Sequence, residues 1–247
     1  MIDFKGSQFE REIILWAVRW YVAYPISYRQ LEEMMGERGV AVDHSTLNRW
    51  VIKYAPEFEK VFRRRQRPVG RSWRLDETYV KIKGKSAYLY RAVDKAGHTI
   101  DFLLTSTRDR DAAEAFLHKA IRTHGLPEKI TIDKSGANTA AIVHYNQTQK
   151  TAIVIRHSKY LNNIVEQDHR AVKRLTRPML GFKSFWSARC TIAGIETMHA
   201  ICKGQLLDTR SKPRTPAEQF YALAVLITRS DRFVRLHFNF ATNRGFC

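Results

Sequence analysis

The spacing of the apolar residues changes once along the chain, at a short basic run over residues 63–68. Before this run, apolar residues recur every three or four positions, which is the period of a helix buried along one face. After it, they fall into short β-rich runs bounded by glycine and polar residues, which predicts strands. The chain of 247 residues is therefore expected to form a small helical module followed by a larger α/β domain.

Three helices are predicted in the N-terminal module. The first ends at Pro25. Ser27 followed by Gln30 is a capping box that begins the second helix. Asp43 caps the third helix, which is expected to stop before Pro56. The apolar stripe of the first helix is expected to consist of Phe9, Ile13, Trp16, Ala17, Trp20 and Tyr24.

The second and third helices, joined by a turn with Gly36 and Gly39, are typical of a helix-turn-helix. Its later helix would lie in the major groove of DNA, where Arg pairs with guanine and Asn with adenine. The predicted base readers are therefore Asn48 and Arg49, and the other predicted DNA contacts on this helix are Ser45, Thr46 and Lys53. The alternative is a three-helix bundle that binds another protein.

The basic run ends at Pro68 and Gly70, and it predicts a linker over residues 63–72. Such a linker would either track DNA or simply be a solvated helix end. The predicted organisation is a helix-turn-helix domain over 1–62, the linker over 63–72, an α/β core over 73–207 and a helical or irregular tail over 208–247.

The order of elements in the α/β part favours an RNase H-like fold of the retroviral-integrase type. Three runs predict an antiparallel meander, a helix follows, and two short buried strands precede a last helix begun by Asn162 or Asn163. The runs are strands over 74–83, 87–94 and 99–105, a helix over 109–124, strands over 129–133 and 152–156, and a helix reaching about residue 176.

The chain carries a net charge of +18, and residues 151–247 hold 16 Lys and Arg against 6 acids. Such an excess points to a polyanion such as double-stranded DNA, because phosphate neutralisation releases counterions. A basic protein with no nucleic-acid role is the alternative. The three cysteines show no CxxC spacing and predict neither disulfides nor zinc. No signal peptide or membrane span is recognised, so we expect a cytoplasmic protein.

Three acids fall where this fold would bring them together. Asp76 lies within the first strand, Asp133 ends the short fourth strand, and Glu166 lies in the first turn of the last helix. Two Mg²⁺ ions about 4 Å apart can activate an attacking oxygen and stabilise a leaving one, and Mg²⁺ prefers carboxylate oxygens. These three residues are therefore the predicted catalytic residues and metal ligands, with Mn²⁺ as a substitute for Mg²⁺.

Each acid also has an ordinary structural interpretation. An Asp at a strand end usually forms a turn, and a Glu in a first helical turn usually complements the helix dipole. Glu77 alternates to the opposite face of its strand and should not join the site. The interpretation as a metal site depends on the three acids occurring together in a basic chain beside a helix-turn-helix.

The helix of Glu166 carries cations at steps of three and four residues. This pattern predicts a helix that grips DNA backbone beside the cleaved phosphate, and the alternative is a salt-bridged surface. The predicted contacts are His169, Arg170, Lys173 and Arg174.

Several long motifs resemble bacterial transposases of the "insertion sequence six" family, from about residue 4 to about residue 207. They are the segments at 49–57, DETYVKIKGK (76–85), AYLYRAVD (87–94), TIDK (131–134), NNIVEQDHRAVKR (162–174) and LGFKS (180–184). The resemblance implies a DDE transposase that uses Mg²⁺ with Asp76, Asp133 and Glu166, and it places the family's basic residue on Lys173. It also implies binding to terminal inverted repeats, a dimer or higher assembly, and replicative transposition in a bacterial, nucleoid-associated setting.

Two features depart from the family. Only 32 residues separate Asp133 from Glu166, and we expect the shortening to fall in a loop between Asn138 and Thr151. The tail after Leu207 does not match, and residues 236–247 are atypical. Three rival functions stand beside transposition: a transcriptional regulator with a silent α/β domain, an RNase H-like nuclease that joins no strands, and a structural basic protein.

Overall fold

The computed structural model describes residues 2–4, 6–133, 136–158, 160–208 and 214–224. The chain begins with three helices, α1 (Arg11–Ala23), α2 (Tyr28–Gly36) and α3 (His44–Arg63). The capping box of Ser27 and Gln30 is present, and the carboxylate of Asp43 accepts hydrogen bonds from the backbone N–H groups of Ser45 and Thr46. The predicted starts of α2 and α3 are therefore confirmed.

Helix α3 does not stop before Pro56, so that prediction is wrong. The helix continues to Arg63 with Pro56 inside it. A proline in a helix interior costs about 3 kcal/mol. Here the apolar stripe continues beyond the proline, and its burial against α7 (Phe185–Cys202) offsets that cost. The buried residues of α3 are Leu47, Trp50, Val51, Tyr54, Ala55, Phe58 and Phe62.

The stripe predicted for α1 is also displaced. Of its members only Ala17 is buried, while Trp16 and Trp20 are partly exposed and Tyr24 is 44% exposed. Helix α1 packs against α2 and α3 as well as α7, so it buries a wider arc than a single stripe. Its buried residues are Ile14, Leu15, Ala17, Val18, Tyr21 and Val22.

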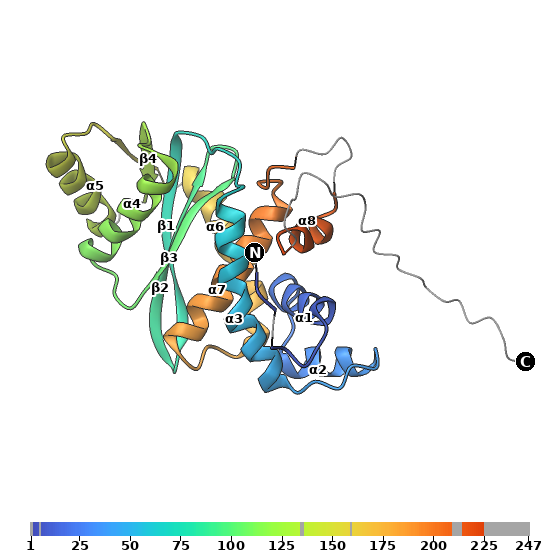
Figure 1. Ribbon diagram of the computed structural model, residues 1–247. Coiled ribbons are helices and arrows are strands. Elements are labelled where there is room, and N and C mark those ends of the chain that lie inside the picture. The colour runs from blue at the N-terminus through green and yellow to red at the C-terminus, as the bar shows by residue number, and fades with distance from the viewer. Residues whose placement is uncertain (1, 5, 134–135, 159, 209–213, 225–247) are drawn as a thin grey trace, which may run out of the picture.

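The α/β part is built on one five-stranded sheet in the order β3-β2-β1-β4-β5 (Figure 1). The pairs β1–β2 and β2–β3 are antiparallel, and β4 and β5 join the other edge of β1 in parallel. This order and these directions are those of the RNase H-like fold, so the predicted fold class is confirmed. The strands are β1 (Ser72–Ile82), β2 (Lys85–Asp94), β3 (Thr99–Thr105), β4 (Lys129–Ile132) and β5 (Val154–His157).

Helices cover both faces of the sheet. Helices α4 (Arg110–His124) and α5 (Gly136–Gln149) bury one apolar core, and α6 (Asn163–Thr176) and α7 lie on the other side. The 3₁₀ turns η1 (Tyr160–Asn162) and η2 (Arg177–Met179) flank α6. The expected loop over 138–151 is wrong, because α5 fills nearly all of it and buries Asn138, Ala141, Ile142 and Tyr145 at helical spacing.

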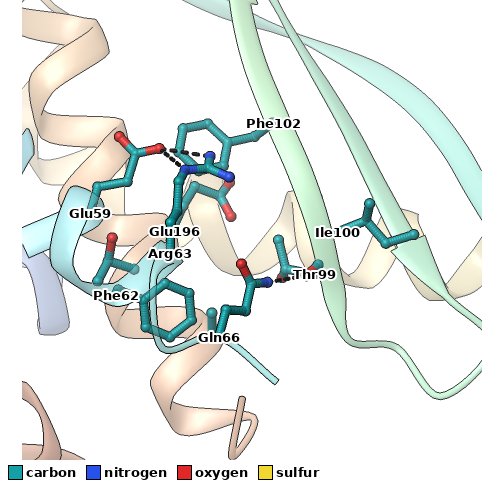
Figure 2. A pocket seen from close by; sticks show the side chains of 10 residues that line it. Glu59, Phe62, Arg63, Gln66, Thr99, Ile100, Phe102 and Glu196 are labelled. Atoms are coloured by element: carbon teal, nitrogen blue, oxygen red, sulfur yellow. Dashed lines mark hydrogen bonds and ion pairs between the residues drawn. The ribbon is translucent and has the colours of Figure 1, made fainter. Parts of the chain in front are cut away.

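The C-terminal end of α3 is fastened to the sheet, as Figure 2 shows. Arg63 bonds Glu59 at 2.7 Å and the buried Asp101 of β3 at 2.7 Å. The Gln66 amide donates to the carbonyl of Thr99 at 3.0 Å. Arg67 N–H donates to the carbonyl of Gln205 at 2.8 Å. The start of the basic run is thus packed between β3 and the segment that follows α7.

The described residues beyond α7 include the helix α8 (Pro216–Ala222), which Thr215 and Glu218 cap. Phe220 stacks on Phe58 at 4.4 Å between ring centroids, so α8 packs on α3. The atypical residues 236–247 lie outside the described residues. Within the described ranges, none of the helices combines the length and the apolar character needed to cross a membrane, and Cys190 and Cys202 are free thiols.

Candidate active site

Asp76 stands near the middle of β1 and faces α6. Its Oδ2 lies 3.3 Å from Nε2 of His169, and its side chain is 18% exposed. His169 is buried, and neither ring nitrogen has a partner with hydrogen-bond geometry. The two side chains are therefore close without a hydrogen bond, which leaves the oxygens of Asp76 available to another partner.

Asp133 directly follows β4, which lies beside β1. The parallel register pairs Arg74 with Thr131. Two residues further along each strand are Asp76 and Asp133, so the two acids leave neighbouring strands at the same level. The backbone carbonyl of Asp133 also meets Nδ1 of His157 at 3.2 Å, which ties it to the end of β5.

Glu166 lies in the first turn of α6, which contacts β1 and β2. The amide of Asn162 donates to the carbonyl of Leu75 at 3.4 Å. One turn beyond Glu166, His169 meets Asp76. Glu166 therefore lies between two contacts of α6 with the stretch of β1 that carries Asp76.

The three acids thus come from adjoining elements, and their donor set suits a hard cation such as Mg²⁺. As placed, however, no three His, Cys, Asp or Glu side chains within the described residues are grouped closely enough to hold a metal ion. The backbone brings the acids to one region, while the side chains do not meet around a common point. Metal binding here would require the side chains to rotate.

Glu77 faces away from this region, as its alternation predicts. Its side chain is only 3% exposed. Nε of Arg108 donates to it at 2.6 Å, and the amide of Asn138 donates at 2.8 Å. Glu77 thereby links β1 to the start of α4 and to α5, a role that the sequence did not reveal because its partners lie 31 and 61 residues away.

A buried charge cluster between the sheet and the helices α6 and α7 was also not predicted from the sequence. Arg91 of β2 is fully buried and contacts Glu196 at 2.8 Å and Asp168 at 3.2 Å. Asp168 is also bonded by His199 and Lys203. Burial raises the pKa of Asp168, but these partners outweigh it and hold the pKa well below its usual range. The cluster joins α6 to β2 and α7, and so fixes the helix that carries Glu166.

The cations predicted on α6 occupy different positions. Arg170, Lys173 and Arg174 are exposed, and Nζ of Lys173 lies 4.4 Å from the ring centroid of Tyr79. His169 is 5% exposed and turned toward Asp76. His169 is therefore a neighbour of Asp76, whereas Arg170, Lys173 and Arg174 form a row that faces solvent.

The predicted DNA contacts on α3 lie at its exposed N-terminal end. Hydrogen bonds from Ser45 and Thr46 hold the pKa of Asp43 well below its usual range, so this cap is a carboxylate at neutral pH. A guanidinium nitrogen of Arg49 donates to Oγ1 of Thr46 at 2.6 Å. Asn48 is partly exposed, and Lys53 is exposed with its ammonium 4.9 Å from the ring centroid of Tyr54.

Residues 70–205 match the sequence profile of a transposase family described as a DDE domain, IS240 type. The chain is also 41% identical over 202 residues to the transposase for the insertion sequence-like element IS431mec of Staphylococcus aureus. That alignment covers 81% of this chain and 88% of the relative. This chain belongs to the insertion sequence six family of transposases. It is therefore a polynucleotidyl transferase with a DDE domain.

A second staphylococcal relative of this transposase is that of element IS257 in transposon Tn4003, also 41% identical over 202 residues and over the same share of each chain. Among solved structures, the HTLV-2 integrase catalytic core in its trimeric form, in complex with magnesium, has a TM-score of 0.42 at 15% identity, covering 54% of this chain and 88% of that one. The catalytic core domain of BIV integrase has a TM-score of 0.42 at 14% sequence identity, covering 62% of this chain and 95% of that one. These likenesses are distant, and the strand order carries the fold assignment.

Proposed function

We propose that this transposase binds the terminal inverted repeats of an insertion sequence and then cuts and joins DNA strands, with Asp76, Asp133 and Glu166 as its metal ligands. The observation that carries the proposal is the adjacency of β1, β4 and α6, which gathers these acids in one region of a basic protein. Membership of the transposase family supplies the reaction class.

Bound Mg²⁺, or Mn²⁺ in its place, would supply the charge that activates the attacking oxygen and neutralises the leaving one. The carboxylate of Asp76 would turn from His169 to the metal ion, and the carboxylates of Asp133 and Glu166 would turn toward the same ion. His169 would then form the buried wall behind Asp76. Fixed positions of these three side chains are the main contribution of the protein to phosphoryl transfer.

The first step breaks one phosphodiester bond by hydrolysis, and the second step keeps the number of phosphodiester bonds constant. In the first step, water attacks a phosphodiester at the element end, the P–O3′ bond breaks and a 3′-OH is freed. In the second step, this 3′-OH attacks a target phosphodiester, so that one P–O bond forms as another breaks. The joining step therefore requires no external energy source.

The N-terminal module is proposed to provide recognition. Residues 1–62 would act as the helix-turn-helix domain, with Asn48 and Arg49 reading bases and Ser45, Thr46 and Lys53 contacting phosphates. Residues 63–72 would link it to the core over 73–207, and 208–247 would be an appended tail. We propose a homodimer or higher assembly, since two element ends must be held together, in the bacterial cytoplasm at the nucleoid.

The substitution Asp76→Asn tests the catalytic assignment. It removes the charge of one metal ligand while keeping the size of the side chain. We expect Mg²⁺-dependent nicking of a labelled element end and strand transfer into plasmid both to disappear, while end binding in a gel-shift assay stays within about twofold of the wild type. Asp111→Asn is the matched control, because Asp111 is an acid whose side chain is 78% exposed at the start of α4. An active Asp76→Asn protein would refute the assignment.

The same assays separate the rival functions. A regulator would bind the ends and show no metal-dependent nicking. A nuclease would nick and transfer nothing, and a structural basic protein would show no metal-dependent chemistry. Matching short inverted repeats in the DNA that flanks the gene would support the proposal independently.

A further inference from the structure

The far end of the β1–β2 hairpin has one bare face. Figure 1 shows α4 and α5 against one face of the sheet, near the place where β4 joins β1. No helix of the described residues covers the same face near the turn between β1 and β2. Tyr79 and Lys81 alternate along the end of β1, Lys83 follows in the turn with φ of 50°, and all three are exposed. The phenol ring of Tyr79 is 58% exposed, so a large ring stands on open surface.

The segment between α6 and α7 extends this surface. Phe182 pairs with the hairpin end, because its N–H donates to the carbonyl of Lys81 at 3.2 Å and its carbonyl accepts from the N–H of Lys83 at 2.9 Å. Two residues earlier, Leu180 is 95% exposed in a left-handed conformation with φ of 53°. At the start of α7, Trp186 is 57% exposed. Three bulky side chains thus face solvent around one strand end.

Cations accompany both rings. Nζ of Lys173 lies 4.4 Å from the ring centroid of Tyr79, and the guanidinium of Arg189 lies 5.4 Å from that of Trp186. Residues 78–87 and 170–189 together contain nine Lys and Arg and no Asp or Glu. A cation on one side of each ring leaves the other side free for a planar group, while the cation itself can reach a phosphate.

We propose that this hairpin-end surface, formed by Tyr79, Lys81, Lys83, Lys173, Leu180 and Trp186, binds DNA whose bases are unpaired beside the cleaved phosphate. The inference deepens the proposed function and rests on it. Exposed rings interleaved with cations are what sequence-independent binding of unpaired bases requires. A second copy of the chain would bring the same dense positive charge against this surface, which opposes a symmetric contact.

The position of the surface fits this ligand. Tyr79 is three strand residues from Asp76, on the opposite face of β1, and Lys173 of α6 reaches its ring around the edge of the strand. Lys173 is seven helical residues from Glu166. Both separations correspond to about 10 Å, which is about three nucleotide steps at ~3.4 Å per step. Tyr79 and Trp186 would stack on bases, and Leu180 would enter the opened base stack as an apolar wedge. The lysines would neutralise the phosphates of the same strand.

Binding of two probes by the full-length protein tests the inference. The probes are oligothymidylate of about 20 nucleotides and a blunt duplex of the same length, and binding is measured in EDTA by fluorescence anisotropy. We expect Tyr79→Ala and Trp186→Ala each to weaken oligothymidylate binding by about 5- to 100-fold, with duplex binding within about twofold of the wild type. Trp186→Phe should restore binding, because it keeps a ring. Tyr24→Ala is the matched control, since Tyr24 is 44% exposed with Arg19 5.5 Å from its ring centroid in another part of the chain.

A second measurement tests the wedge. With 2-aminopurine about three nucleotides from the cleavage point, the wild type should raise the fluorescence of the end duplex, and Leu180→Ala should abolish the rise. Equal losses on both probes, or no loss, would overturn the inference, as would a change in sedimentation that accompanies the loss. These assays need no metal, so their failure leaves the cutting activity untouched, whereas failure of the proposed function would appear as absent nicking with normal oligothymidylate binding.

Discussion

Replacing Gly194 by alanine should weaken the joint between the helical module and the catalytic core. Gly194 lies in the middle of α7, where α1 and α3 pack on it. A Cβ at this position would stand 2.7 Å from Cγ1 of Val22 and 2.9 Å from Cβ of Ala55. The Val22 methyl can rotate away, but the Ala55 Cβ is fixed to its backbone, so the helices themselves must separate.

The size of the effect follows from two opposing contributions. Alanine favours a helix over glycine by about 1 kcal/mol, while overpacking a well-filled core costs about 1–3 kcal/mol. With contact distances this short we expect a net loss of about 1–2 kcal/mol in the free energy of unfolding. For a chain of this size that corresponds to a fall of about 2–8 °C in Tm.

Differential scanning calorimetry and urea unfolding measure this loss. Gly36→Ala is the matched control, because Gly36 is the last residue of α2 and a Cβ there meets nothing within 4 Å. That variant should match or slightly exceed the stability of the wild type. If Gly194→Ala is as stable as Gly36→Ala, the close approach of α7 to α1 and α3 is not what the structure indicates.

Three further predictions concern charge and recognition. Burial raises the pKa of Asp101, but Lys119 and Arg63 outweigh it and hold the pKa below its usual range. The stability that Asp101 contributes is therefore present above about pH 4 and is lost as the pH falls below that value. Asp101→Asn should remove this loss of stability in unfolding curves measured from pH 5 downward. Arg91→Leu leaves Glu196 buried without its cation and should cost about 3–5 kcal/mol in urea unfolding, unlike a surface arginine. Asn48→Ala should reduce discrimination between element-end and random duplexes by about 1–3 kcal/mol at fixed salt, and unchanged discrimination in competition binding would contradict its role as a base reader.

The parts of the fold that the sequence predicted are those with local signals. The three meander strands have alternating patterns, and the capping box at Ser27 and the cap at Asp43 are read from residues three positions apart. Helix α5 was missed because its buried face begins with the polar Asn138 and includes the small Ala141, which hides the apolar period. The stop at Pro56 failed because the burial of α3 against α7, far along the chain, outweighs the local cost of proline.

The candidate site divides in the same way. Asp76, Asp133 and Glu166 were predicted because each lies at a recognisable place in a strand or helix, and the structure brings those elements together. The contact of His169 with Asp76, and the pairing of Arg91 with Glu196, join residues that are 93 and 105 positions apart. No short-range pattern reports such pairs, since they depend on which faces of β1 and β2 meet α6 and α7.

The unbroken course of α3 through Pro56 has a mechanical consequence. Its 20 residues make a rod of about 30 Å, with Asn48 and Arg49 near one end and Arg63 pinned to β3 at the other. In the proposed function, α3 would hold Asn48 about 22 Å from Arg63, where the helix is fastened to β3, which is about six to seven base pairs of duplex. DNA that lengthens the interval between the bases read and the phosphate cut by half a helical turn would then present the wrong side of the duplex to the acids, so the proposed function predicts a fixed spacing within each terminal repeat.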